Sequence, residues 1–370
     1  MGLGIFITVN DKIDTGLTQQ VSSVEVYEKI DESTQYKINF MIDICDKDIA
    51  HNLEEFTDPG SVLGVLVGVN DALVCLVTGP VTKQEANLQH GGAGSSLHIE
   101  GTDTSHDMTI KPFHNVRNGT DSAIVNGILR SYDFGGRDVS NTDGAAHQDE
   151  NHSVVQRETD LTFIKRLAQR NGFHFWISYD EKGKGTAHFK PRSLDGKPVN
   201  ELIVNLENNN IDNLRINSDM NRPTQVEGQQ VNLRTKEIIG GLVSLSQETV
   251  LGANNLATVA GSRANSMALS PTVDDGGSMT IRSEAALKEA QWFITATCQT
   301  SFRKLCNKIV RVHTVVMVQG AGTRHSGKYY VTGVKHTIDA ANHKMDIELA
   351  RNAWGDDKSG GASGLLNKIF

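Results

Sequence analysis

The chain has 370 residues, enough for two or three domains that each bury a core. Its 44 acidic residues outnumber 36 lysines and arginines, and the formal net charge is -8. No overall basic field therefore exists to hold nucleic acid or an anionic membrane surface, and neither specific nucleic-acid binding nor membrane insertion is expected.

The four cysteines, Cys45, Cys75, Cys298 and Cys306, have neither the paired spacing of a zinc site nor the density of a disulfide-rich secreted domain. We interpret them as buried thiols formed in a reducing cytoplasm. The N-terminus lacks the features of a signal peptide, and the sequence contains no run of about 18 apolar residues. A soluble protein without Sec-dependent export is predicted.

The first 110 positions have the pattern of antiparallel β-structure. Alternating polar and apolar residues predict strands over 5–9, 21–27 and 36–42. Residues 62–69 and 73–81 are nearly all apolar and flank a turn at Asn70 and Asp71, which predicts a hairpin covered on both faces.

The spacing of the apolar residues changes in the middle of the chain. Thr120 is placed to cap a short helix with Ile124 and Ile128 on one face, and residues 135–152 are polar and Gly-rich, which predicts a mobile loop. A clear amphipathic helix is predicted over 159–171, with Asp160 in its first turn. A strand over 173–177 and a hairpin turn around 180–185 follow.

Strands return from 202 to 241, and residues 250–280 contain few large apolar side chains, which predicts an extended connection. A long helix is predicted over 283–305 because apolar residues, among them Ile294, Cys298 and Phe302, recur every three or four positions. The last predicted strands are 308–312, 314–318, 328–336 and 344–349, followed by a flexible tail over 355–366.

The most specific segment is RETDLTFIKRLAQRNGFHF at 157–175. This segment predicts a capped helix that packs on the strand following it, and Gly172 is predicted to supply the left-handed turn between them. The segment resembles a motif of phage late control gene D proteins and VgrG proteins. The matching positions are Glu158, Asp160, Phe163, Arg166, Leu167, Gly172 and Phe175.

Two further segments resemble the same family in the same order. Residues 74–82 are similar to its hairpin, and SGKYYVTGVKH at 326–336 is similar to its closing strand. In the closing strand, the matching positions are Gly327, Tyr329, Val331 and His336. The resemblance covers roughly residues 5–350, and it gives these residues structural roles without a catalytic, cofactor-binding or metal-binding site.

The resemblance implies a mainly β fold with α+β insertions. Two related β-barrel domains would give a pseudo-sixfold ring in a homotrimer, beside a smaller α/β domain. The expected domains are a first tube-like barrel over 1–112, an α+β domain over 113–205, a second barrel region over 206–354 and a flexible tail over 355–370.

The resemblance also implies the hub of a contractile phage tail or a related injection system, which joins a trimeric spike to a hexameric tail tube. VgrG proteins continue past this region into a fused spike, whereas only about twenty low-complexity residues follow Leu349 here. The expected partners are therefore a separate spike protein, the tail tube protein, and baseplate wedge or tape-measure components. The expected location is the virion tail baseplate or an injection particle assembled in the bacterial cytoplasm.

Several sequence patterns that can mark a metal or phosphate site are better explained here as ordinary loops or strand ends. A solvated loop explains His147–His152 better than a metal site does, and strand-end charge explains Asp43, Asp46 and Asp48 better than a calcium loop does. The Gly-rich stretch 90–95 lacks the Lys-Ser/Thr of a phosphate-binding loop, so a hairpin loop is favoured. No cofactor is expected.

Two alternatives stay open. A tail-associated cell-wall-degrading enzyme is unsupported by any nucleophile elbow, zinc motif or acid pair in the sequence, but dispersed catalytic carboxylates escape such a search. A carbohydrate-binding β-domain would need exposed aromatics, whereas Trp176 and Trp292 lie in apolar patterns typical of core packing. For His336, we favour a structural role.

Overall fold

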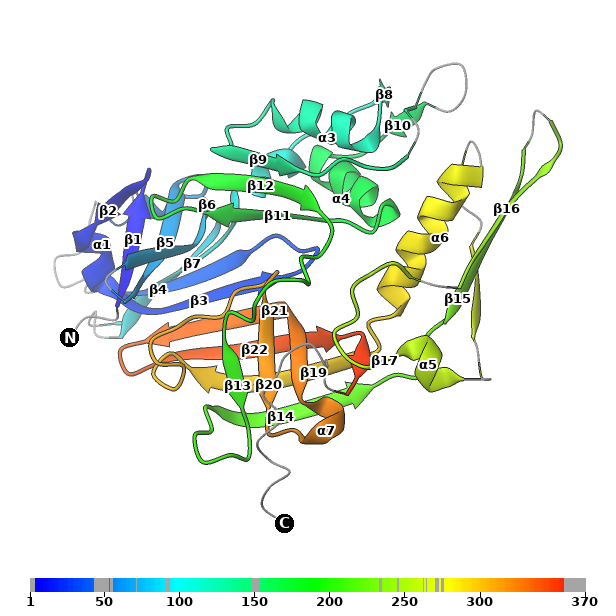
Figure 1. The fold of residues 1–370 in the computed structure, drawn as a ribbon. Helices are drawn as coiled ribbons and strands as arrows, with labels where there is room; N and C mark the ends of the chain where they lie inside the picture. Colours follow the sequence, from blue (N-terminus) through cyan, green and yellow to red (C-terminus); the bar gives the residue numbers. More distant parts are fainter. Residues whose placement is uncertain are drawn as a thin grey trace, which may run out of the picture.

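The computed structural model describes residues 4–355 except 43–52, 54–55, 71, 91–93, 145, 148–152, 233–234, 245, 262, 264, 270–272 and 274–275. Strands make up 47% of the chain and helices 18%, so the predicted mainly β class is confirmed. Figure 1 shows a large sheet, a smaller α/β domain above it and an arm that projects to one side.

The first β-rich region contains every strand predicted there, together with a short helix α1 (Thr15–Gln20) that was not predicted. Asp14 caps this helix by accepting a hydrogen bond from the backbone N–H of Leu17 at 2.8 Å. Alternate residues of the fourth strand, Tyr36, Ile38 and Phe40, are buried in the core of this region. The strands are β1 (Ile5–Val9), β2 (Lys12–Asp14), β3 (Val21–Lys29), β4 (Gln35–Ile42), β5 (Val62–Val69), β6 (Ala72–Asn87) and β7 (Ser95–Thr102).

The second β-rich region has its own core, which includes Leu202, Ile294, Tyr329, Val331 and Ile347. Period-two burial along its strands places these side chains on one face of the sheet. The strands are β13 (Glu201–Ile203), β14 (Ile211–Ser218), β19 (Ile294–Ser301), β20 (Val315–Gln319), β21 (Gly327–Asp339) and β22 (His343–Arg351).

The two regions form one continuous sheet because β21 pairs antiparallel with β3, from Gly333 opposite Lys29 to Asp339 opposite Ser23. The strand order is β14-β19-β22-β21-β3-β4-β7-β6-β5-β1-β2, with β20 also on β21 and β13 on β20. Within the described residues this pairing does not close into a ring. The described strands thus show two cores along one sheet, and β21 extends past its own region and places Ile338 in the first core. The two closed barrels stay a prediction.

A smaller α/β domain lies between the two regions in sequence, and both of its predicted helices are confirmed. Thr120 caps the first helix and Thr159 the second, each by accepting from a backbone N–H within the first turn. The elements are η1 (Thr104–Thr109), β8 (Asn115–Arg117), α3 (Asp121–Leu129), β9 (Gly136–Val139), β10 (Val154–Gln156), α4 (Asp160–Arg170), β11 (His174–Tyr179) and β12 (Gly185–Lys190).

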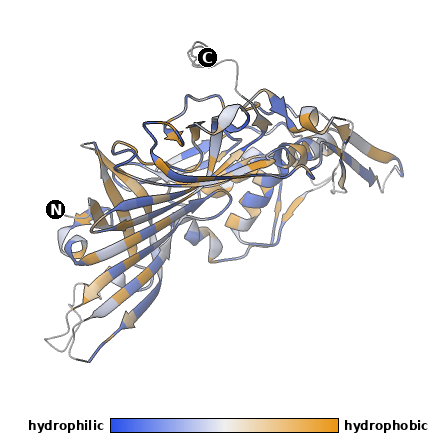
Figure 2. Ribbon diagram, turned by 90° about the horizontal axis from the view of Figure 1, so that it is seen from below, coloured by the Kyte–Doolittle hydropathy of each residue, from blue (hydrophilic) through white to orange (hydrophobic). Residues whose placement is uncertain are grey.

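The arm is a three-stranded sheet in the order β16 (Ile238–Val243), β15 (Gln225–Val231) and β18 (Ser266–Leu269). The helix α6 (Gly276–Ala290) covers one face of it so closely that a side chain at Gly228 would collide with Met279. In Figures 1 and 2 the arm projects away from the main sheet. The remaining elements are β17 (Asn254–Asn255), α5 (Leu256–Ala260), α7 (Gly322–His325) and β23 (Ala353–Trp354).

The long helix predicted over 283–305 is confirmed up to residue 290 and wrong beyond it. The helix ends at Ala290, and Ile294–Ser301 forms β19 between β14 and β22. Ile294, Cys298 and Phe302 are four residues apart, and an even spacing also keeps side chains on one face of a strand. The spacing of the apolar residues alone therefore could not distinguish a helix from a strand in this segment.

Three other local predictions need correction. Residues 308–312 form no strand, and the predicted loop 135–152 contains β9, which pairs parallel with β12. The predicted extended connection 250–280 contains β17, α5, β18 and the start of α6. Cys306 is exposed, whereas Cys75 and Cys298 are buried as predicted. Predictions for Asp43, Asp46, Asp48, Cys45, residues 148–152 and the tail beyond Gly355 lie outside the described residues.

The core of the α/β domain depends on the apolar stripe of α4, and this leads to a first prediction. Phe163 is fully buried there, so Phe163→Ala should lower the free energy of unfolding by about 3–5 kcal/mol through lost burial and a cavity. Chemical denaturation measures this loss. Gln169→Ala, at an exposed position on the same helix, should change it by less than about 0.5 kcal/mol. Equal effects of both changes would contradict the assigned packing.

Candidate functional site

The polar residues of the helix motif fix the start of α4. Asp160 is buried and accepts hydrogen bonds from the Tyr132 hydroxyl and the Gln156 side-chain amide, both at 2.7 Å. Burial is the main cause that raises the pKa of Tyr132, and the hydrogen bond to Asp160 raises it further. Glu158 accepts from Arg166 Nε at 2.7 Å on the surface of the helix. These contacts tie α4 to the segment after α3 and to β10.

The apolar residues of the same motif lie in one core, and its glycine lies at a close approach. Phe163, Leu167 and Phe175 are all buried in the α/β domain. Gly172 has a φ of 66°, and a Cβ added there would lie 3.4 Å from the Cα of Ala285 on α6. The left-handed turn predicted for Gly172 is present, and it also lets α6 pack against this domain.

The closing motif lies on β21, in the main sheet. Tyr329 and Val331 are fully buried in the second core. Gly327 has a φ of 131°, and any side chain there would collide with the guanidinium group of Arg351. That guanidinium is fully buried and donates to the backbone oxygen of Leu251 at 3.0 Å, so it links β22 to the segment before α5.

The two motifs thus lie in different cores, and no shared site brings them together. His336, the last residue of the closing motif, is fully buried, and its Nδ1 lies 3.0 Å from Nε2 of His343. Burial lowers the pKa of His343 to about 4 and the pKa of His336 well below its usual value. Both imidazoles are therefore neutral at physiological pH, and the structural role favoured for His336 stays a prediction.

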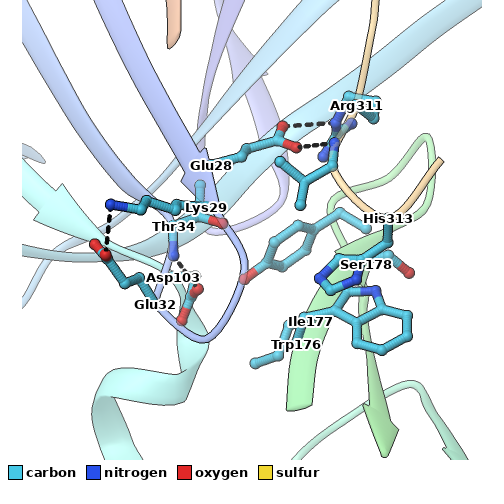
Figure 3. Close-up of a pocket in the computed structure, with 12 residues that line it drawn as sticks. Glu28, Lys29, Glu32, Thr34, Asp103, Trp176, Ile177, Ser178, Arg311 and His313 are labelled. Atoms are coloured by element: carbon cyan, nitrogen blue, oxygen red, sulfur yellow. Dashed lines mark hydrogen bonds and ion pairs between the residues drawn. The ribbon is translucent and has the colours of Figure 1, made fainter. Parts of the chain in front are cut away.

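Sequence reasoning missed a polar junction where the two β-rich regions and the α/β domain meet. A cavity of about 180 Å³ lies there, between the turn from β3 to β4, the strand β11 and the segment 311–313. Figure 3 shows Glu28, Asp103, Trp176, Arg311 and His313 around it. These side chains come from distant parts of the sequence, so no local pattern could reveal them.

An ion pair between Glu28 and Arg311 lines one side of the cavity, with Arg311 Nε 2.6 Å from a carboxylate oxygen (Figure 3). Glu28 is almost fully buried, and Arg311 also donates to the backbone oxygens of Cys75 and Leu76 at 2.9 and 3.1 Å. The guanidinium group therefore joins β3, β6 and the segment before β20.

Trp176 is half-buried and stacks against two histidine rings outside the hydrophobic cores, so the core-packing interpretation does not hold for it. His313 stacks on one face with ring centroids 3.8 Å apart, and His188 stacks on the ring at 4.8 Å. Burial, reinforced by nearby positive charges, lowers the pKa of His313 well below its usual value. The pairing of Trp176 with His188 follows from the predicted hairpin, but the contact with His313 could not be predicted from sequence.

Arg192 continues the junction toward α6. Its guanidinium group lies 4.7 Å from the ring centroid of Trp292 and forms ion pairs with Glu248 and Glu289. Trp292 donates to Glu248 at 3.0 Å. Burial raises the pKa of Glu248, and the charge of Arg192 opposes that shift. Trp292 is 4% exposed, as the core-packing interpretation predicted.

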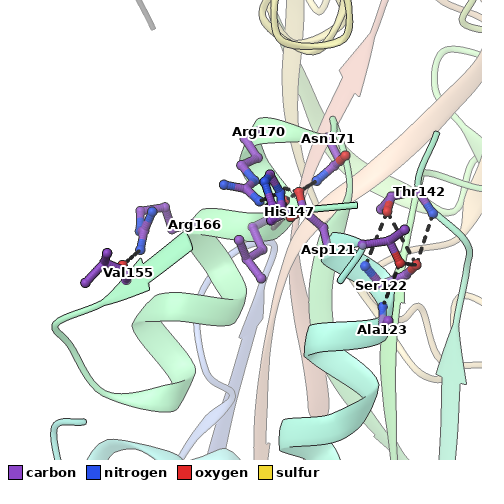
Figure 4. A network of polar contacts seen from close by, with 11 residues as sticks. Asp121, Ser122, Ala123, Thr142, His147, Val155, Arg166, Arg170 and Asn171 are labelled. Carbon is purple, nitrogen blue, oxygen red and sulfur yellow. Dashed lines mark hydrogen bonds and ion pairs between the residues drawn. The ribbon is translucent and has the colours of Figure 1, made fainter. Parts of the chain in front are cut away.

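A second polar network holds α3 against α4 (Figure 4). The carboxylate of Asp121, in the first turn of α3, accepts from Arg170 and from the Asn171 side-chain amide. His147 Nε2 lies 3.0 Å from the same carboxylate. Arg170, Asn171 and His147 gathered around one buried carboxylate stabilise the packing of the two helices.

The chemistry available at these places is limited. In the described ranges, no group of three or more His, Cys, Asp or Glu side chains is placed to hold a metal ion. Burial raises the pKa of Cys75 to about 11 and that of Cys298 to about 12, so both thiols are neutral and weak nucleophiles. No described helix is both long and apolar enough to cross a bilayer. The charges instead neutralise one another across domain boundaries.

Comparison with known proteins places the chain in a family. The family model described as the Alg8 N-terminal domain matches residues 7–340. The chain belongs to this family. Its name differs from that of the late control gene D family, so membership of the latter stays a prediction. No curated protein matches the chain.

Solved structures of tail proteins share this fold. A tail protein from Neisseria meningitidis is 12% identical, with a TM-score of 0.65 over 96% of this chain and 99% of its own. The 43 kDa tail protein of prophage MuSo2 from Shewanella oneidensis is 14% identical, with a TM-score of 0.65 over 94% and 98%.

The likeness extends to secretion systems. An Escherichia coli component of the type VI secretion system, described as similar to T4 bacteriophage tail proteins, is 15% identical, with a TM-score of 0.57 over 93% of this chain and 76% of its own. At these identities the likeness establishes the fold alone. The resemblance to the VgrG and phage tail class is therefore supported at the level of fold.

The Glu28–Arg311 pair gives a prediction about stability. Arg311→Met should destabilise the chain by about 3–5 kcal/mol, because it leaves the buried Glu28 carboxylate without its cation. The double variant Arg311→Met with Glu28→Gln should recover at least half of that loss in chemical denaturation. Additive losses in the double variant would show that the two groups do not depend on each other.

The buried pair His336 and His343 gives a prediction about pH. The unfolded chain takes up protons on these imidazoles near pH 6.5, whereas the folded chain holds the pKa of His343 at about 4 and that of His336 well below its usual value. Stability should therefore fall as pH drops from about 6.5 toward 4.

Melting curves at several pH values measure this effect. The double variant His336→Gln with His343→Gln should show a shallower decline over the same window. His90→Gln, at an exposed position, is the matched control. An unchanged slope in the double variant would rule out these two groups as the source of the pH dependence.

Proposed function

We propose that this chain is the structural hub of a contractile phage tail or a related injection system, and that it works as a homotrimer between a trimeric spike and a hexameric tail tube. One observation carries the proposal: a single chain has two β cores along one sheet. Three such chains would offer six β units around one axis, which matches a sixfold tube to a threefold spike.

The extent of the fold similarity supports this proposal. The likeness to the two tail proteins covers nearly the full length of each and 94–96% of this chain, so it is not confined to one common domain. The junction also suits a structural role, because the ion pairs and stacked rings at Glu28, Arg311 and Trp176 bind domains to one another.

The proposed partners are a separate spike protein, the tail tube protein and baseplate wedge or tape-measure components. The proposed location is the tail baseplate of a virion or injection particle, assembled in the bacterial cytoplasm. The late control gene D family remains the relationship that the motifs suggest.

We propose no catalytic activity for the chain. The described thiols with raised pKa are neutral, and in the junction Arg311 is paired with Glu28 and Arg192 with Glu248. A carbohydrate platform is also disfavoured, because His188 and His313 cover Trp176 and the rest of the chain buries Trp292.

The oligomeric state and partner binding test the proposal. Mass photometry of the purified chain at micromolar concentration should show a trimer, and co-purification with the spike protein from the same gene cluster should give a complex with three copies of each. A monomer at all concentrations that binds neither spike nor tube protein would refute the proposed function.

A zymogram on bacterial cell walls tests the absence of activity. No clearing is expected from the purified chain, while a lysozyme lane provides the positive control. Clearing that persists across independent preparations would favour the cell-wall-degrading alternative.

A further inference from the structure

The arm leaves one face of its sheet uncovered. Because α6 packs on the side of Val226, Gly228 and Val243, the alternate side chains of β15 and β16 point the other way. This uncovered side, called the arm face below, carries three exposed apolar residues, Val231 at 52%, Ile238 at 72% and Leu242 at 65% exposure. Figure 2 shows hydrophobic colouring on these projecting strands.

One charged side chain lies on the arm face within β15. Glu227 is exposed and pairs directly across the strands with Leu242, while Val231 pairs with Ile238. Gln229 donates to the Glu227 carboxylate at 2.9 Å and leaves its charge in place. The arm face is thus a small apolar surface with an acidic group beside it.

A second exposed apolar surface lies on the α/β domain. Val116 of β8 and Val155 of β10 are direct cross-strand neighbours, 59% and 41% exposed. The same antiparallel register continues to a bridge between Pro112 and Thr159, which places His114 opposite Arg157. Residues 154 and 156 are buried, so the alternate residues face outward.

This outward side, called the ribbon face below, consists of His114, Val116, Val155 and Arg157. Arg157 is exposed beside Val155, so the surface is apolar with a basic group beside it. The arm face and the ribbon face therefore resemble each other in apolar character and are opposite in charge.

We propose that the arm face of one copy of this chain docks on the ribbon face of a second copy. The proposal rests on the homotrimer proposed above and assigns the surfaces that hold it together. A closed ring needs two different complementary patches on every chain, so that each copy gives one and receives the other. Glu227 would face Arg157, while Ile238 and Leu242 would pack against Val116 and Val155.

The two faces belong to separate elements of one chain, as a head-to-tail contact requires. Covering exposed apolar side chains at direct cross-strand positions removes apolar surface from water and so favours association. The arm sheet also has only three strands and one helix on one face, so a second covering layer would stabilise it.

Charge reversal tests the assignment. In mass photometry and sedimentation velocity, Glu227→Arg or Arg157→Glu should raise the concentration at which half of the trimer dissociates by at least about tenfold. The double variant with both changes should return to within about threefold of the unmodified chain. Ile238→Asp and Val116→Asp should each prevent the trimer. Met41→Asp, on β4 at a position 68% exposed and outside both faces, is the matched control and should assemble normally.

Mixing distinguishes the head-to-tail contact from contact between two arms. Equal amounts of the Ile238→Asp chain and the Val116→Asp chain retain one intact pair of faces, so the mixture should form dimers that neither chain forms alone. Thermal melting of each variant should match that of the unmodified chain, since every changed residue is exposed.

The outcomes separate this inference from the proposed function. If the unmodified chain is a trimer and all four single variants remain trimers, the inference is overturned while the hub proposal stands. If the variants remain trimers but lose binding to spike or tube protein, the faces serve that partner and the inference is again overturned. A monomeric unmodified chain would remove the homotrimer and the inference together.

Discussion

The pairing of β21 with β3 is the constraint on which the rest of the structure depends. It brings residues 333–339 next to residues 23–29 and joins two β-rich regions that would otherwise form separate sheets. Such a pairing between sequence-distant strands gains nothing until both regions have formed. Between these two strands the chain leaves the sheet after β7, returns to it at β13 and β14, leaves it again for the arm and returns at β19.

The join is also where the buried polar groups are concentrated. Glu28 lies at the end of β3, its carboxylate 2.6 Å from Arg311 and 4.0 Å from Nε2 of His336 on β21. A buried carboxylate and guanidinium compensate each other only when the two regions meet in the correct register. Trp176 then fixes the α/β domain to the same place through its contact with His313. The junction thus orients all three parts with paired charges and stacked rings.

The elements that the sequence predicted correctly are those whose signals are local. The helix α4 combines a Thr159 cap, an apolar stripe and the left-handed Gly172 within fifteen residues, and each feature supports the same structure. At 294–302 the spacing of four fits a helix and one face of a strand equally, so tertiary pairing with β14 and β22 decided the outcome. Local pattern carries no information about such pairing.

The junction and the single sheet were beyond prediction for a related reason. Arg311 lies in a segment predicted as a strand, and nothing near it in sequence reveals that its partner is Glu28. The two barrels came from family resemblance, whereas the sequence pattern gave no sign that β21 would reach from its own region into the first core. The resemblance predicted the mainly β class correctly, but it did not predict which strands pair with each other in the sheet.

The distribution of polar and apolar groups explains why assembly surfaces would lie on the thin elements. The buried Glu28 is paired with Arg311 inside the junction, and the main sheet places its large side chains in two cores. A three-stranded sheet with a helix on one side, and a two-stranded ribbon, are too thin to bury both of their faces. The exposed apolar residues Ile238, Leu242 and Val116 lie on these thin elements. These faces are exposed in a single chain because the elements that carry them are thin. In the proposed hub, the same faces would form the contacts between the chains of the ring.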